Sequence, residues 1–128
     1  MIQLPIILMA ASMGVWLFFV QHQFEDTVWE EPPEWDRREA AMHGSSHYVL
    51  PAPLQWLTGN IGIHHVHHLS SHIPFYRLPQ VLRDYPELAD ISRITLFESF
   101  KCARLTLWDR DGYRMISFRE AFAKAAAT

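Results

Sequence analysis

Cysteine is nearly missing from this 128-residue chain, in which Cys102 is the only one. A single thiol excludes an intrachain disulfide and also excludes zinc sites built from several cysteines. Basic residues are not in surplus either, with 11 Lys and Arg against 14 Asp and Glu. The resulting net charge of −3 argues against nucleic-acid binding, which needs a surface that neutralises phosphates. Any metal bound by this chain must therefore be held by imidazole, with or without carboxylate.

Charged side chains are absent from residues 1–24, and all of them lie from Glu25 onward. Residues 4–20 form an apolar run with Ser12 as the only polar interruption, and as a helix this run is about 26 Å long. That length is at the short end of what crosses a hydrocarbon core of about 30 Å. We predict one transmembrane helix within residues 1–24. Because every Lys and Arg follows it, residues 25–128 are predicted to be cytoplasmic.

The apolar run could also be a secretory signal peptide or a buried helix of a soluble protein. A secretory signal peptide would carry a basic residue before the run and a small-residue cleavage site after it, and the sequence VQHQFEDTVW that follows has no such site. A buried helix of a soluble protein would need a larger protein around so uniform an apolar surface. Both alternatives fit less well than a membrane span.

The remainder of the chain predicts short helices separated by prolines, so the fold class is mainly α. Helices are expected over residues 34–43, 79–85 and 94–108, and a short helix or frayed tail over residues 119–128. The pair Asp111-Gly112 between alternating residues predicts a β-hairpin. The aromatic residues Tyr48 and Trp56 suit either a membrane interface or ordinary core packing.

Five of the eight histidines lie within residues 64–72, namely His64, His65, His67, His68 and His72. Asn60 is expected to cap a helix that holds them and Pro74 to end it. On such a helix His64, His67 and His68 share one face, whereas His65 points about 100° away. A divalent metal would bind three neutral imidazoles together. The alternative is a solvated histidine-rich patch.

The other histidines are assigned from their surroundings. His22 comes two residues after the apolar run, where it is either an interfacial residue or a fourth imidazole delivered to the same metal. His43 and His47 are expected on the surface or in a loop. His72 is expected to lie on the surface or to contact the metal ligands without binding the metal itself.

Residues 59–78, GNIGIHHVHHLSSHIPFYRL, resemble the third histidine box, HxxHH, of the membrane fatty acid desaturases. The resemblance is greatest to the bacterial and plastid-type acyl-lipid enzymes that act at the ω-6 or Δ12 position. The stretches WLFFVQHQFEDTVW, GSSHYVLPAPLQWLTGNIG and LWDRDGYRMISF are similar to the C-terminal part of that family in the same order. The resemblance covers nearly the whole chain, from about residue 3 to residue 118.

The resemblance implies that His64, His67 and His68 are iron ligands and that His22 is an additional ligand just beyond a transmembrane helix. It implies a non-haem di-iron centre that introduces a cis double bond into the acyl chain of a membrane lipid, using dioxygen. The electrons would come from a ferredoxin or a cytochrome b5. The fold would be part of a multi-pass membrane di-iron protein in a bacterial inner membrane, with residues 25–128 as a cytoplasmic, mostly helical cap.

The chain departs from the family pattern because it has no place for the two earlier histidine boxes. Four ligands cannot hold two irons in the usual way, so the di-iron centre would be incomplete. The sequence is therefore expected to be the C-terminal fragment of a desaturase (a truncated gene product, a split subunit or a partial sequence), inactive alone. The alternatives are a non-catalytic membrane-anchored metal-binding or interaction protein and a fragment of a related membrane hydroxylase.

Overall fold

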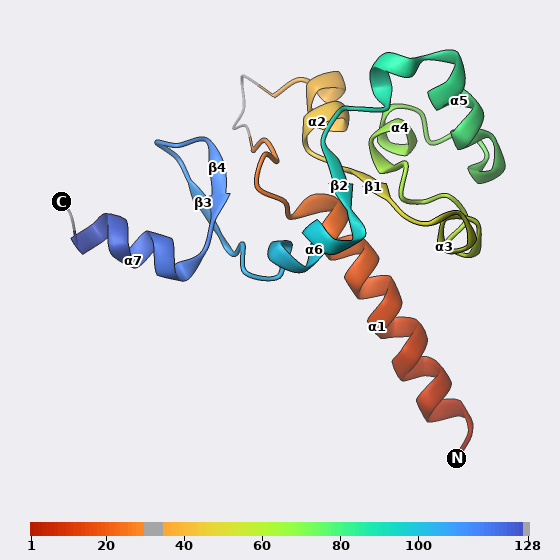
Figure 1. The fold of residues 1–128 in the computed structure, drawn as a ribbon, viewed down its shortest axis with the longest axis horizontal. Coiled ribbons are helices and arrows are strands. Elements are labelled where there is room, and N and C mark those ends of the chain that lie inside the picture. Colours follow the sequence, from red (N-terminus) through yellow and green to blue (C-terminus); the bar gives the residue numbers. More distant parts are fainter. Residues whose placement is uncertain (30–34, 127–128) are drawn as a thin grey trace.

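The structure is a computed structural model that describes residues 1–29 and 35–126. It is mainly helical, and one long helix, α1, projects away from a body of short helices and strands (Figure 1). The elements, in chain order, are α1 (Gln3–His22), α2 (Arg37–His43), β1 (His47–Val49), α3 (Ala52–Leu57), α4 (His64–Leu69), η1 (Phe75–Arg77), α5 (Leu78–Asp84), η2 (Pro86–Leu88), β2 (Arg93–Thr95), α6 (Leu96–Cys102), β3 (Leu107–Asp109), β4 (Arg114–Ile116) and α7 (Phe118–Ala126).

Helix α1 carries the predicted membrane-spanning run. Its mean hydropathy is 1.9, and it is the one helix in the described part of the chain that is long and apolar enough to cross a membrane. Most of its side chains are exposed, and its C-terminal turn alone is buried, through Val20 and Gln21. An exposed helix that is apolar on all sides needs an apolar solvent. The body therefore buries only the last turn of α1, and Trp16, Leu17 and Phe19 just before it are partly buried against the core.

The body is built on a two-stranded parallel pair. Strand β1 pairs with β2 in the register His47↔Arg93, Tyr48↔Ile94 and Val49↔Thr95. Parallel strands need a long crossover connection, and here α3, α4 and α5 supply it. The end of α1 and the histidine-bearing α4 both contact strand β1, so the pair brings these two helices close to each other.

Two apolar clusters stabilise this arrangement. Val20, Phe24, Tyr48, Ile94 and Cys102 form the first, which joins α1 to the strands and to α6. The second consists of Ile63, Val66 and Leu78 and joins α4 to α5.

Tyr48 is a core residue, with 1% of its surface exposed, and its hydroxyl forms a hydrogen bond 3.0 Å long with Ser99 Oγ. The interfacial reading of Tyr48 is therefore wrong, because strand β1 turns its side chain into the body. Trp56, on α3, is 78% exposed and remains open to a membrane interface.

The long helix predicted over residues 94–108 is wrong. Residues 93–95 form β2, and Thr95 then caps α6 through a capping box in which Glu98 reaches back to it. The helix ends at Cys102, and Trp108 lies in β3, paired with Met115 of β4. Of the aromatic residues in the predicted helix, Phe97 and Phe100 lie within the seven residues of α6, whereas Trp108 does not.

Asn60 does not cap α4, which begins at His64 after Ile63. Asn60 instead has a φ of 56°, and its side-chain amide donates to the carbonyl of Phe75 at 3.1 Å. Asparagine adopts this left-handed conformation more readily than most residues, and the hydrogen bond ties the loop before α4 to η1.

The other predicted elements are present with small changes at their ends. Helix α2 begins after Asp36, whose carboxylate accepts from the backbone of Arg38 and Glu39, and it ends at Gly44. Residue 34, where the prediction began, lies outside the described residues. Helix α5 and the β3–β4 hairpin match their predictions. Helix α7 covers the predicted C-terminal helix up to residue 126.

Candidate metal centre

Three histidines from two helices converge at the junction of α1 and α4. The Nε2 atom of His22 lies 3.1 Å from that of His68 and 3.2 Å from that of His64. The Nε2 atoms of His64 and His68 are 3.1 Å apart. We call these three residues the histidine triad. His22 and His64 are 42 positions apart in the sequence, so only the tertiary fold brings them together.

The orientation of His22 is set by its own helix. Its Nδ1 lies 2.8 Å from the carbonyl oxygen of Phe18. A carbonyl can only accept, so Nδ1 carries the proton and Nε2 presents a lone pair to the triad. A backbone carbonyl on the far nitrogen is the usual way in which proteins orient a histidine that binds a metal.

The triad fits a metal ion better than it fits a set of hydrogen bonds. Because His22 Nε2 has no proton, the three pairwise contacts cannot all be hydrogen bonds between neutral rings. A zinc-sized ion bound at about 2.0–2.1 Å keeps its nitrogen ligands roughly 3 Å from one another. The observed separations of 3.1–3.2 Å match that spacing. Imidazole donors suit iron as well as zinc and copper.

The junction between α1 and α4 is held by buried polar contacts. Gln21, which is 2% exposed, donates through Nε2 to the carbonyl of Ile61 at 3.0 Å. The backbone N–H of Ser46 donates to the carbonyl of Gln21 at 2.9 Å, and its hydroxyl donates to the carbonyl of Val20 at 3.3 Å. Ser46 therefore satisfies two carbonyls that the end of α1 leaves free. These contacts fix the residue before His22 against the loop that leads into α4.

Electrostatics favour neutral rings at His64 and His68. Burial, followed by repulsion from His22 and His68, lowers the pKa of His64 from its ordinary value of 6.5 to about 3. Partial burial and the proximity of His22 also lower the pKa of His68. Metals bind the unprotonated ring, so His64 is held in the binding form throughout the physiological pH range.

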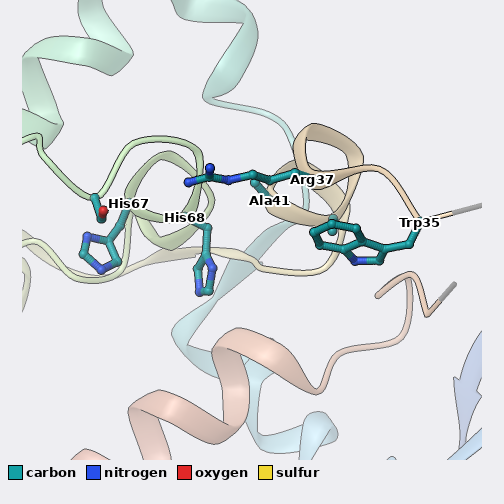
Figure 2. A pocket seen from close by; sticks show the side chains of 7 residues that line it. Trp35, Arg37, Ala41, His67 and His68 are labelled. Atoms are coloured by element: carbon teal, nitrogen blue, oxygen red, sulfur yellow. The ribbon is translucent and has the colours of Figure 1, made fainter. Parts of the chain in front are cut away.

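His67 is the predicted ligand that does not join the triad. Its ring stacks on that of His64, with the ring centroids 5.7 Å apart. Together with His68 it lines a cavity of about 450 Å³ whose other walls are Trp35, Arg37, Ala40, Ala41 and Ser71 (Figure 2). Of the histidine triad, His68 lines this cavity, whereas His22 and His64 do not.

His65 points away from the triad, as its position on the helix predicts. It is fully buried, and its Nε2 lies 2.8 Å from the carbonyl oxygen of Leu88. His47 stands beside it, with the ring centroids 5.4 Å apart, and its Nδ1 lies 2.6 Å from the carbonyl oxygen of Ala89. The two rings thus anchor α4 and β1 to the last residue of η2 and to the residue that follows it.

The expectation that His47 is a surface or loop residue is wrong, because His47 begins β1 and is half-buried. No local pattern signals this, since its partners come from a strand 46 residues later. The remaining two histidines lie on the surface, as expected. His43 faces Glu39 across 3.5 Å on α2, and His72 is exposed.

His65 should make the fold acid-sensitive. Burial lowers the pKa of His65 to about 4, below the ordinary value of 6.5. Between pH 4 and pH 6.5 the ring is therefore protonated in the unfolded chain and neutral in the folded chain. The stability that this ring contributes is complete above pH 6.5 and is lost as the pH falls toward 4, a loss of roughly 3 kcal/mol. Thermal unfolding of the metal-free protein, followed by circular dichroism, should show a falling midpoint over this range.

The matched variant is His65→Gln, which keeps a donor for the carbonyl of Leu88 but does not titrate. It should unfold at a somewhat lower temperature than the unchanged protein at pH 7.5 and depend less on pH. An equally steep pH dependence in the variant would remove His65 from this role.

A long apolar helix that brings one imidazole to a histidine-rich helix is the arrangement expected of a class of membrane proteins that could hold a metal ion through nitrogen ligands. Comparison with known proteins narrows that class. The chain belongs to the fatty acid desaturase family, because the family model described as fatty acid desaturase matches residues 1–100.

One relative covers nearly the whole chain. The chain is 48% identical to the fatty acid desaturase of Bacillus subtilis (strain 168) over 119 residues, which are 93% of this chain and 34% of that protein. The chain therefore spans about a third of the length of this relative. No solved structure matches the chain.

Proposed function

We propose that this chain forms the C-terminal part of a membrane fatty acid desaturase that introduces a cis double bond into an acyl chain. The observation that carries the proposal is the convergence of His22, His64 and His68 in a member of the desaturase family. Family membership alone would not identify ligands, and three close imidazoles alone would not identify a reaction.

The proposed cofactor is a non-haem di-iron centre, of which this chain supplies four ligands. In this proposal the histidine triad holds one iron. His67, on the far side of His64 and beside the cavity in Figure 2, serves the second. The centre is incomplete with these residues alone, because the described part of the chain brings no other histidine to the triad or to His67. The cavity offers room for further ligands from polypeptide outside this chain.

The bound irons would supply the oxidising power that an unactivated C–H bond requires. In the overall reaction two adjacent methylenes each lose one hydrogen, and dioxygen takes up those hydrogens, two electrons and two protons to give two waters. The electrons would come from a ferredoxin or cytochrome b5 type donor. The residues of this chain would keep neutral nitrogen donors in place, and Phe18 and Ser46 would hold His22 and the end of α1 at a fixed distance from α4.

The acyl substrate places this chemistry at a membrane. In the proposed topology α1 crosses the inner membrane of a bacterium, and residues 25–128 form a cytoplasmic cap. The exposed apolar length of α1 supports this, since only its last turn is buried in the body. The triad then lies where the acyl chain of a lipid meets the cytoplasmic surface.

The test is a chimera in which this chain replaces the matching third of the Bacillus subtilis relative. Expressed in a host without desaturases of its own, the chimera should produce new unsaturated fatty acids, measured by gas chromatography and mass spectrometry of the lipids. The matched control is the relative with that third deleted, which should produce none. A chimera that accumulates in the membrane, binds iron and yields no product would contradict the proposal. Hydroxylated fatty acids would point instead to the related hydroxylases.

A further inference from the structure

Helix α6 carries two aromatic side chains that nothing covers in the described part of the chain. Phe97 is 83% exposed and Phe100 is 60% exposed, although both are large apolar residues. They are three positions apart and so lie on one face of the helix. The opposite face is firmly held, because Ser99 and Cys102 are buried in the body.

The orientation of this face is fixed rather than adjustable. The hydroxyl of Ser99 donates to the carbonyl of Leu96 at 2.6 Å. It can therefore accept a hydrogen bond from the hydroxyl of Tyr48, 3.0 Å away. The capping box between Thr95 and Glu98 fixes the start of the helix. Rotation of α6 to hide Phe97 and Phe100 would break the hydrogen bond between Ser99 and Tyr48 and expose Cys102.

The exposed face is continuous with the apolar surface of α1. The ring of Phe100 lies against that of Trp16, with the centroids 5.6 Å apart. Trp16 is six positions before His22, the last residue of α1, which corresponds to about 9 Å along the helix axis. Helices that lie in a membrane interface bury their apolar face about 5–10 Å into the lipid. Phe100 therefore lies at the depth that an interfacial side chain would occupy.

The polar surroundings also suit the lipid headgroups. Lys101 and Arg104 follow directly on the chain and are exposed, and cationic side chains are attracted to anionic headgroups. The nearby carboxylate of Glu98 is already engaged by the backbone and hydroxyl of Thr95. With seven residues α6 is far too short to span a bilayer.

We propose that α6 is an interfacial helix that inserts Phe97 and Phe100 into the cytoplasmic leaflet beside α1. This proposal rests on the proposed insertion of α1 in the membrane. The body would then touch the bilayer at a second point, which fixes the tilt and rotation of the triad relative to the acyl chains. The exposed cations Lys101 and Arg104 beside this apolar face favour an anionic lipid surface as its occupant over an apolar protein partner.

The experiment compares fluorescent labels at single cysteines, in a Cys102→Ala background reconstituted in vesicles of phosphatidylcholine and phosphatidylglycerol. Phe97→Cys reports on the proposed face. Gln80→Cys on α5 is the exposed control, and Leu8→Cys reports on α1. With an environment-sensitive label, Phe97→Cys should emit at shorter wavelength than Gln80→Cys. It should be quenched by lipids spin-labelled near the headgroup and protected from aqueous iodide.

The three positions separate the possible failures. If the Leu8 label is embedded and the Phe97 label is open to iodide, the interfacial helix is excluded while the membrane span stands. If the Leu8 label is itself open to iodide, the span and the interfacial helix both fail. In the chimera, a Phe97 label protected from iodide and from lipid quenchers alike would show that protein covers α6, and would also overturn the proposal.

Discussion

Changing His64 to alanine in the chimera should abolish the formation of unsaturated fatty acids and lower the iron content of the purified protein. His64 is the most enclosed member of the triad, with its Nε2 within 3.2 Å of both partner nitrogens, and alanine leaves nothing that could rotate into its place. The loss should exceed the roughly 10–100-fold typical of groups that only orient a ligand. Product analysis and metal analysis of the same preparation measure both effects.

His22→Ala is the sharper variant in this series, because His22 reaches the triad from a separate helix. We expect a loss as large as that of His64→Ala, and the same for His68→Ala. His67→Ala should also abolish product, while the iron held by the triad is retained, so about half of the metal should remain. His72→Ala is the matched control on the same segment and should leave activity and iron unchanged. Normal iron and normal turnover in His22→Ala would return His22 to an interfacial role.

The isolated chain should bind one transition-metal ion tightly and produce no unsaturated fatty acid. The triad provides three nitrogen ligands for one ion. His67 provides a single ligand, which is not enough to bind a second ion tightly. Titration of the purified chain with Co²⁺, followed by its visible absorption, should saturate at one ion per chain. His67→Ala should saturate in the same way, and His22→Ala should bind far more weakly.

Lipid analysis of cells that express the isolated chain completes this prediction. An unsaturated product made by the 128-residue chain would show that four histidines suffice. Tight binding of two ions would show the same for the metal centre. Either result would overturn the proposed need for ligands from other polypeptide.

The features that could be predicted from the sequence are those that depend on neighbouring residues. The apolar run of α1 is visible without any tertiary information, and the helical spacing that groups His64 with His68 is local as well. The position of His22 after the apolar run makes it a candidate fourth imidazole, and the resemblance to the desaturases then implies that it is a ligand. Its convergence with α4 depends on the buried contacts of Gln21 and Ser46, which no local pattern reveals.

The separation of His67 from the triad could also have been read from helix geometry. A residue four positions on is displaced by about 40° around the axis, whereas one three positions on is displaced by about 60° the other way. His67 and His68 therefore lie about 100° apart, and an ion that joins His64 to His68 is out of reach of His67. The prediction that His67 and His68 both share a face with His64 does not distinguish their two directions.

The errors come from contacts between distant segments. His47 and the residues around Ile94 belong to a parallel strand pair whose members are 46 positions apart, and the same pair decides between the two alternatives for Tyr48 in favour of core packing. Strands of three residues are too short to show a clear pattern in the sequence. The apolar residues of β2 and α6 are adjacent in the chain and therefore predict a single helix. Only the capping box at Thr95 marks the boundary between them, and it is present in the sequence as Thr95 followed by Glu98.

The distance along the chain between the ligands has a consequence for the order of folding. His22 is synthesised 42 residues before His64 and 46 before His68, so it has no partners while the polypeptide between them is being made. Bringing the ends of a 42-residue loop together costs about 3 kcal/mol of chain entropy. An ion bound across that gap opposes reopening much as a covalent cross-link would. In the proposed metal protein, the ion would therefore be bound only after His68 has been synthesised and α4 has packed against the end of α1.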